Sequence, residues 1–160
     1  MVNEVTIYTD GSARGNPGPG GFGIVMLAGN YAKEFSEGYR YTTNNRMELL
    51  GVITALEKLR KPGTLVLVVS DSKYVVDAVE KGWVFGWEQK RFAKAKNPDL
   101  WKRFLIIFRQ HQVKFKWIKG HAQNPYNNRC DELAVEAAKG HRLHIDKGYE
   151  STVSAKEGLF

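Results

Sequence analysis

The sequence predicts an α/β (or α+β) domain built around a mixed β-sheet. Strand-like segments come first in the chain, helix-like and strand-like segments then alternate, and the connections between them are short. With 160 residues, 42% of them hydrophobic, the chain can bury a core without disulfides or structural metals. This length favours one domain, and no internal repeat or linker divides it.

The first three predicted strands cover residues 3–9, 22–27 and 31–41. In the first of them, Val5 and Ile7 alternate with polar residues, as in a half-buried strand. We expect Asp10–Gly11 to close this strand and the glycine- and proline-rich residues 13–23 to form a turn. Residues 28–30 suit a hairpin loop, so the three strands are expected to form an antiparallel meander.

The hydrophobic pattern then takes a helical period. Apolar residues recur at near-helical spacing over residues 45–60, and Lys61–Pro62–Gly63 is expected to stop this helix. The run Thr64–Val69 is typical of a strand buried on both faces. The remaining elements are predicted as helices over 71–80, 100–108 and 128–139 and a strand over 113–118, with residues 88–98 irregular and Pro98 starting the second of these helices.

The N-terminal residues, the lack of a long apolar run and the single cysteine indicate the cellular compartment of the protein. Met1–Glu4 lacks the basic start and long apolar run of a signal peptide, and no apolar run is long enough to span a bilayer. Cys130 has no partner for an internal disulfide, which favours a reducing, cytoplasmic location. Residues 146–160 are expected to form a C-terminal tail whose last ten residues are partly disordered.

The net charge of +7 is concentrated in one stretch. Residues 81–119 hold eleven Lys and Arg, two acids and all four tryptophans, whereas the rest of the chain holds 13 basic and 15 acidic residues. Lys and Arg neutralise phosphates and aromatic faces pack on sugars or bases, so this distribution predicts a nucleic-acid-binding surface. A solvated basic face with tryptophans in the core is the alternative.

Four acidic residues stand where predicted strands end or helices begin. Asp10 ends the first strand, Asp71 follows the buried strand, and Glu48 and Asp131 lie in the first turns of two helices. These positions fall near one edge of an α/β sheet, where ligands usually bind. Clustered carboxylates repel one another unless cations neutralise them, and their oxygens suit Mg²⁺ or Mn²⁺.

Each of these acids also has a local structural explanation. Asp10–Gly11 is a turn dipeptide, and Asp71 suits the N-cap of its own helix. Asn45–Glu48 and Asn128–Asp131 both resemble capping boxes. The sequence spacing alone therefore leaves the metal site and the structural explanations open.

Two further segments carry residues typical of functional motifs. His121 lies in a polar, glycine-flanked loop and could transfer protons at neutral pH, although a histidine in such a loop is usually a surface residue. Gly18–Gly23 has the spacing G-x-G-x-x-G, but these glycines precede a strand rather than a helix, which argues against a dinucleotide site. The lone Cys130 excludes a Cys-rich zinc site.

Four ordered blocks of the chain closely resemble bacterial type 1 ribonuclease H. The blocks are Tyr8–Gly21, Thr42–Leu49, Ser70–Tyr74 and Lys119–Ala134, and each contains one of the four acids. The resemblance runs from about residue 3 to residue 140. It implies a ribonuclease H-like fold, with a five-stranded mixed sheet of three antiparallel strands then two parallel, flanked by helices, and it implies that residues 1–145 form the catalytic domain.

The resemblance also implies endonucleolytic cleavage of the RNA strand of RNA–DNA hybrids, leaving 5′-phosphate and 3′-hydroxyl ends. Asp10, Glu48, Asp71 and Asp131 match the family's metal-binding carboxylates, which implies two Mg²⁺ ions during catalysis, with Mn²⁺ as a substitute. His121 matches a loop histidine thought to assist proton transfer or product release. A monomer with no obligate protein partner and no membrane association is expected.

Substrate contacts follow from the same resemblance. Asn16, Asn45 and the backbone near Ser12 match positions that touch ribose hydroxyls. Lys73 matches a further ribose-contacting position, where relatives often have glutamine. Thr43 matches a residue that holds a phosphate of the DNA strand. The expected handle that grips the DNA strand carries Trp83, Trp87, Lys90, Arg91, Lys94 and Lys96.

Two other functions stay open from the sequence. A non-catalytic nucleic-acid-binding module of the same fold would share the basic stretch, although the four intact acids argue against it. A DNA-processing relative, such as a transposase or integrase core, would share the fold, but such proteins usually carry different acid spacings and additional domains.

Overall fold

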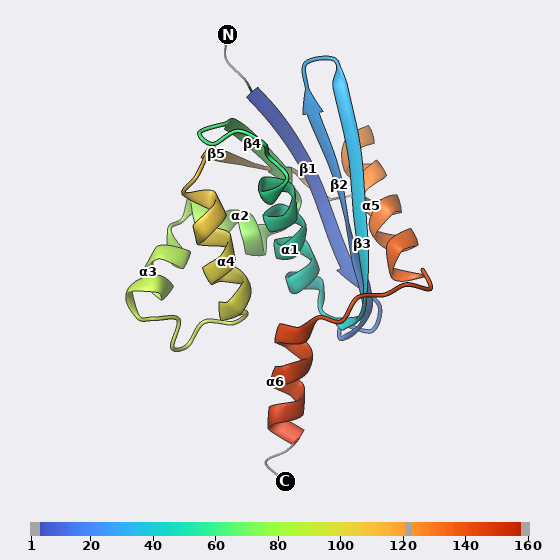
Figure 1. The fold of residues 1–160 in the computed structure, drawn as a ribbon, viewed down its shortest axis with the longest axis vertical. Helices are drawn as coiled ribbons and strands as arrows, with labels where there is room; N and C mark the ends of the chain where they lie inside the picture. Colours follow the sequence, from blue (N-terminus) through green and yellow to red (C-terminus); the bar gives the residue numbers. More distant parts are fainter. Residues whose placement is uncertain (1–3, 121–122, 158–160) are drawn as a thin grey trace.

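The computed structural model describes residues 4–120 and 123–157, and within these ranges a five-stranded mixed sheet is flanked by helices (Figure 1). The strands are β1 (Glu4–Ala13), β2 (Gly18–Ala28), β3 (Tyr31–Thr42), β4 (Leu65–Ser70) and β5 (Gln112–Trp117). Their order is β3-β2-β1-β4-β5. The first three strands are antiparallel, and β4 pairs in parallel with β1 and β5. The predicted fold class is confirmed.

Helices cover both faces of the sheet. They are α1 (Asn44–Glu57), α2 (Lys73–Glu80), α3 (Trp83–Gln89), α4 (Pro98–Phe108), α5 (Pro125–Ala138) and α6 (Lys147–Glu157). Alternation along β2 separates the two layers: Phe22 packs against Gly51 of α1, whereas Gly21 and Gly23 lie against α5. No helix within the described ranges is long and apolar enough to cross a membrane.

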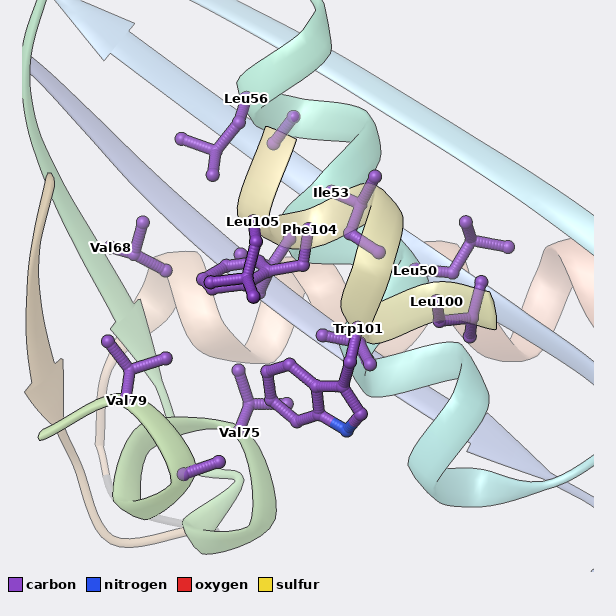
Figure 2. Close-up of a cluster of buried hydrophobic side chains, with 14 of the residues drawn as sticks. Leu50, Ile53, Leu56, Val68, Val75, Val79, Leu100, Trp101, Phe104 and Leu105 are labelled. Atoms are coloured by element: carbon purple, nitrogen blue, oxygen red, sulfur yellow. The ribbon is translucent and has the colours of Figure 1, made fainter. Parts of the chain in front are cut away.

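The main hydrophobic core lies between the sheet and the α1–α4 layer. Figure 2 shows Ile53 of α1 and Phe104 of α4 in one cluster with Val68 of β4 and Val75 of α2. The predicted burial of β4 on both faces holds in part, since Val66 and Val68 are buried while Leu65 and Leu67 are half-buried. The core therefore holds α1, α2 and the end of β4 in fixed relation.

The first strand and the glycine-rich segment differ from the prediction. β1 continues through Asp10 and Gly11 to Ala13, and β2 already begins at Gly18, so only residues 14–17 connect them. The glycines are needed here because helices approach the strands closely. A Cβ atom on Gly11 would lie 2.5 Å from the backbone nitrogen of Glu48, and one on Gly23 would collide with the carbonyl oxygen of Cys130.

The helix caps also differ from the prediction. The residues whose side chains accept the capping hydrogen bonds are Thr43 for α1, Ser72 for α2 and Asn124 for α5. The predicted capping boxes at 45–48 and 128–131 are therefore wrong, and Asp71 does not cap α2. Because α1 and α5 begin earlier than predicted, Glu48 and Asp131 lie beyond the first helical turn. The end of α1 at Glu57 likewise precedes the predicted stop.

Two helices were not predicted. The short helix α3 forms mainly over residues 83–87, for which no element was predicted, and it extends two residues into the segment 88–98 that was predicted to be irregular. Residues 90–97 are irregular as predicted. Helix α6 occupies Lys147–Glu157, much of the segment that was predicted as a C-terminal tail. Asp146, which precedes α6, is buried and bonded to Arg46, and this contact ties the C-terminal segment to α1.

Candidate active site and nucleic-acid interface

Four elements bring the four predicted carboxylates together. Asp10 lies in β1 and Glu48 in α1, whereas Asp71 follows β4 and Asp131 lies in α5. The carboxylate of Asp10 interacts electrostatically with Asp71 and lies within hydrogen-bonding reach of Asp131. Glu48 interacts with Asp71 in turn. Residues that are up to 121 positions apart in the sequence thus form one acidic cluster.

Close backbone packing places these side chains. Asp10 pairs with Gly23 across the β1–β2 ladder, and Gly23 leaves room for the α5 backbone at Cys130, next to Asp131. Gly11 does the same for α1 at Glu48. Two glycines that neighbour Asp10 along and across the strands therefore allow α1 and α5 to approach the sheet closely beside the acidic cluster.

Burial and mutual repulsion set the charge state of the cluster. Burial raises the pKa of Asp10, and the negative charges of Asp71 and Asp131 raise it further. Burial also raises the pKa of Glu48 to about 7, a hydrogen bond from Ser72 opposes part of this rise, and Asp71 adds to it. The cluster is therefore a place where negative charge is costly and where a cation would be stabilised.

Ser72 is a site residue that the sequence reasoning missed. Its hydroxyl donates a 2.5 Å hydrogen bond to Oε2 of Glu48 and accepts a 3.2 Å bond from the N–H of Val75. The side chain that caps α2 thus also orients Glu48. The sequence signal was present, because a serine directly before a helical pattern is a preferred N-cap.

Asp71 is surrounded by residues from β5, α2 and the segment after β5. The indole Nε1 of Trp117 donates a 3.1 Å hydrogen bond to the carbonyl oxygen of Asp71, and the ammonium of Lys73 lies 4.8 Å from the centre of the Trp117 ring. A Cβ atom on Gly120 would lie 3.1 Å from Oδ2 of Asp71. The predicted His121 lies outside the described residues.

The cluster has the donor chemistry of a hard-cation site. Its ligands are carboxylate oxygens, which suit Mg²⁺, Mn²⁺ or Ca²⁺ rather than soft metals. Within the described ranges, no three His, Cys, Asp or Glu side chains are already spaced as a complete metal-binding group.

Three of the predicted substrate contacts lie together beside the start of α1. The N–H of Asn44 donates a 2.9 Å bond to Oδ1 of Asn16, and Oδ1 of Asn44 accepts a 2.6 Å bond from the N–H of Ala13. These bonds hold the β1–β2 loop against α1. Asn16, Thr43 and Asn45 then line one surface cavity of about 650 Å³. Ser12 lies nearby in β1 and is half-buried.

The tryptophans of the basic stretch have different environments. Trp83 of α3 is 48% exposed, with the ammonium of Lys81 over its ring, whereas Trp87 is half-buried and packs edge-on against Trp101. Trp101 is fully buried and its Nε1 donates a 2.8 Å bond to the hydroxyl of Tyr74. The core explanation therefore applies to Trp101, while Trp83 is available at the surface.

The predicted basic contacts are all exposed. Lys90, Arg91, Lys94 and Lys96 follow α3 and lie at the surface. Lys90 and Lys94 line a cavity of about 340 Å³ together with Trp87 and Phe92. This part of the chain presents cations and an aromatic ring in one place, which is the combination that nucleic-acid backbones and sugars bind.

The chain is similar to known proteins over most of its length. The RNase H family model matches residues 2–139. Ribonuclease H of Desulforamulus reducens is 52% identical over 150 residues, covering 91% of this chain and 94% of that protein. Ribonuclease HI of Synechocystis sp. is 49% identical over 153 residues, covering 92% and 95%.

Solved structures show the same fold. LC9-RNase H1, a type 1 RNase H with the type 2 active-site motif, superposes with a TM-score of 0.79 at 30% identity, covering 94% of this chain and 81% of that one. LC11-RNase H1 in complex with an RNA/DNA hybrid superposes with a TM-score of 0.63 at 32% identity, covering 84% and 96%. On the sequence match, the sheet topology and these relatives, the chain belongs to the RNase H family.

Proposed function

We propose that this protein is an endonuclease that hydrolyses the RNA strand of RNA–DNA hybrids and leaves 5′-phosphate and 3′-hydroxyl ends. The observation that carries the proposal is the convergence of four carboxylates from β1, α1, α5 and the end of β4. The names of the relatives support the activity, and the hybrid-bound neighbour supports the substrate.

Asp10, Glu48, Asp71 and Asp131 are the residues that would hold divalent cations, two Mg²⁺ ions in our proposal, with Mn²⁺ as a substitute. Their repulsion and the raised pKa of Asp10 support this, because bound cations would offset the cost of four negative charges. When bound, such ions activate a water molecule and stabilise the leaving oxygen of the phosphodiester. Ser72 would keep Glu48 oriented towards the cluster.

The remaining residues select and hold the substrate. The 2′-hydroxyl group marks the RNA strand, and the amides of Asn16 and Asn45 and the Ser12 region supply donors and acceptors that can recognise it. Thr43 and Lys73 would contact the sugar–phosphate backbone. The handle residues Trp83, Trp87, Lys90, Arg91, Lys94 and Lys96 would grip the DNA strand through sugar packing and phosphate neutralisation. His121 is proposed to assist proton transfer or product release.

A cleavage assay tests the proposed function. The full chain is incubated with an end-labelled RNA annealed to DNA, in Mg²⁺ or in EDTA, with duplex DNA and duplex RNA as controls. We expect shortened RNA only from the hybrid and only in Mg²⁺. Binding without cleavage would favour the non-catalytic module, and cleavage of duplex DNA alone would favour a transposase-like activity. Monomeric state and cytoplasmic location stay predictions from the sequence.

A further inference from the structure

The C-terminal helix α6 forms one wall of the surface cavity beside α1. The opposite walls carry Thr43 and Asn45 from the start of α1 and Lys96 from the segment after α3, while α6 contributes Tyr149 and Thr152. In Figure 1, α6 extends from the end of the molecule where α1 begins and points away from the sheet. The cavity therefore lies between the start of α1 and a helix that the sequence did not predict.

The position of α6 is built by buried polar contacts. Asp146 accepts hydrogen bonds of 2.7 and 2.9 Å from the guanidinium of Arg46 and one of 2.8 Å from the hydroxyl of Thr42. It also accepts a 3.3 Å bond from the N–H of Tyr149, so it caps the first turn of α6. Arg46 and Asp146 are 3% and 6% exposed, which makes this a core attachment rather than a loose tail.

The same arginine joins α6 to the basic segment. Arg46 also donates bonds of 2.9 and 2.7 Å to Asp99 at the start of α4 and one of 3.3 Å to Oδ1 of Asn97. One buried guanidinium thus fixes three walls of the cavity relative to one another: the start of α1, the end of the basic segment and α6. A second tie at the surface, between Arg40 of β3 and Glu150 of α6, has bonds of 2.8 and 2.9 Å.

The chemistry of the cavity suits a sugar–phosphate unit. Its lining offers side-chain amides of Asn16 and Asn45, hydroxyls of Thr43, Tyr149 and Thr152, and the ammonium of Lys96. Hydroxyls, amides and cations are the groups that most often contact phosphate and sugar oxygens. Arg46 in the same lining is paired with both Asp99 and Asp146, so Lys96 is the cation of the lining that no carboxylate of this network pairs with.

We propose that α6 is part of the nucleic-acid interface: its Tyr149–Thr152 face closes a cavity that receives a sugar–phosphate unit of the bound hybrid, which lengthens the binding groove beyond the basic segment. This inference rests on the proposed function, since it takes the hybrid as the ligand. It assigns a binding role to the C-terminal helix and makes Thr152 the residue through which that role is tested.

Thr152 has a matched control on the same helix. Ser151 is also an exposed hydroxyl residue of the described part of α6, but it lies outside the cavity lining. Thr152→Glu and Ser151→Glu therefore change the net charge equally and differ in whether the new carboxylate faces the cavity. Thr152→Lys and Ser151→Lys form the corresponding cationic pair.

The test measures binding of a fluorescent RNA–DNA hybrid by anisotropy, in EDTA and over a range of salt concentrations. Thr152→Glu should raise the Kd at least about fivefold, as expected for a carboxylate brought within about 4 Å of a phosphate. Ser151→Glu should change the Kd by less than about twofold, because charges more distant in solvent are screened. Thr152→Lys should steepen the salt dependence by about one phosphate contact, and Ser151→Lys should not.

Equal effects of Thr152→Glu and Ser151→Glu, with wild-type unfolding midpoints in urea, would overturn the inference. The wild-type chain separates this result from failure of the proposed function. If wild type cleaves the hybrid in Mg²⁺ while the two variants behave alike, α6 is outside the interface and the proposed function stands. If wild type neither binds nor cleaves the hybrid, the proposed function and this inference both fail.

Discussion

The hydroxyl of Ser72 donates a 2.5 Å hydrogen bond to the carboxylate of Glu48. The same hydroxyl caps α2, so the start of a helix and the orientation of a site carboxylate depend on one oxygen atom. Glu48 belongs to α1 and Ser72 to the segment after β4, so this hydrogen bond joins two elements that are distant in the sequence. The four acids therefore depend on a supporting hydroxyl as well as on the backbone that carries them.

Ser72→Ala should weaken both stability and activity. Loss of the cap costs about 1 kcal/mol of unfolding free energy. Loss of a hydrogen bond to a charged group should lower hybrid cleavage about tenfold or more, because Glu48 is no longer held towards the cluster. Urea unfolding and steady-state cleavage of a labelled hybrid measure the two effects. Ser72→Thr keeps the hydroxyl and should recover most of the activity; equal losses in Ser72→Ala and Ser72→Thr would contradict the positioning role.

The raised pKa of Glu48 makes folding stability depend on pH in the absence of metal. The pKa of Glu48 is about 7 in the folded chain, above its ordinary value of 4.5, because burial disfavours the charged form. The folded state therefore binds the proton more tightly than the unfolded state. Its stabilising contribution is fully present below about pH 4.5 and is lost as the pH rises through about 7.

Glu48→Gln removes this dependence, because the amide stays neutral. In EDTA, the variant should gain on the order of 2 kcal/mol of unfolding free energy relative to wild type between pH 5 and pH 8. Urea unfolding at the two pH values measures the change. Glu4→Gln, at an exposed position, is the control and should show no comparable gain. A constant difference between Glu48→Gln and wild type across this range would contradict the buried, raised-pKa carboxyl.

Arg46→Ala should be strongly destabilising. It leaves the buried Asp146 without its guanidinium and removes the tie to Asp99, and breaking such a buried pair costs about 3 kcal/mol or more. Arg40→Ala removes an exposed pair with Glu150 and should cost much less unfolding free energy, because solvent screens that pair. Urea unfolding compares the two. Similar small losses in both variants would show that Arg46 does not hold the three walls together.

Charge reversal in the basic segment should weaken hybrid binding while the fold is retained. The variant carries Glu at Lys90, Arg91, Lys94 and Lys96, which are exposed. Its Kd should rise and its salt dependence should flatten, because fewer phosphates are neutralised. A control with the same composition reverses Lys33, Lys58, Arg60 and Lys61, which surround cavities near the β2–β3 hairpin. If both variants lose affinity equally, only the net charge matters and the basic segment is a solvated face.

The regular elements and the acidic residues could be predicted from the sequence where the signal lay within one short segment. Periodicity located α1 and β4 to within a few residues, since each repeats an apolar pattern over its whole length. Four ordered blocks, each with one acid, led to the same family that the comparisons show. These predictions succeed because the residues that determine each element or motif lie close together in the sequence.

The failures involve contacts between distant segments. The glycines of residues 18–23 suggested a turn, but they form a strand that pairs with β1 and β3. Glycine is needed at position 23 because α5 packs too closely for a side chain there. Helix α6 has a weak apolar pattern, and its position depends on Arg46, which is 100 residues away from Asp146. Periodicity within one segment contains no information about either contact.

The central claim is that the four carboxylates perform hybrid cleavage, and Asp10→Asn tests it most directly. Asn keeps the size of the side chain and removes a negative charge from a cluster where charge is costly, so the fold should be at least as stable as wild type. We measure cleavage of an end-labelled RNA in a hybrid with Mg²⁺, together with hybrid binding. Asp10→Asn should bind the hybrid within about twofold of wild type and produce no shortened RNA. Cleavage by Asp10→Asn at the wild-type rate would contradict the account.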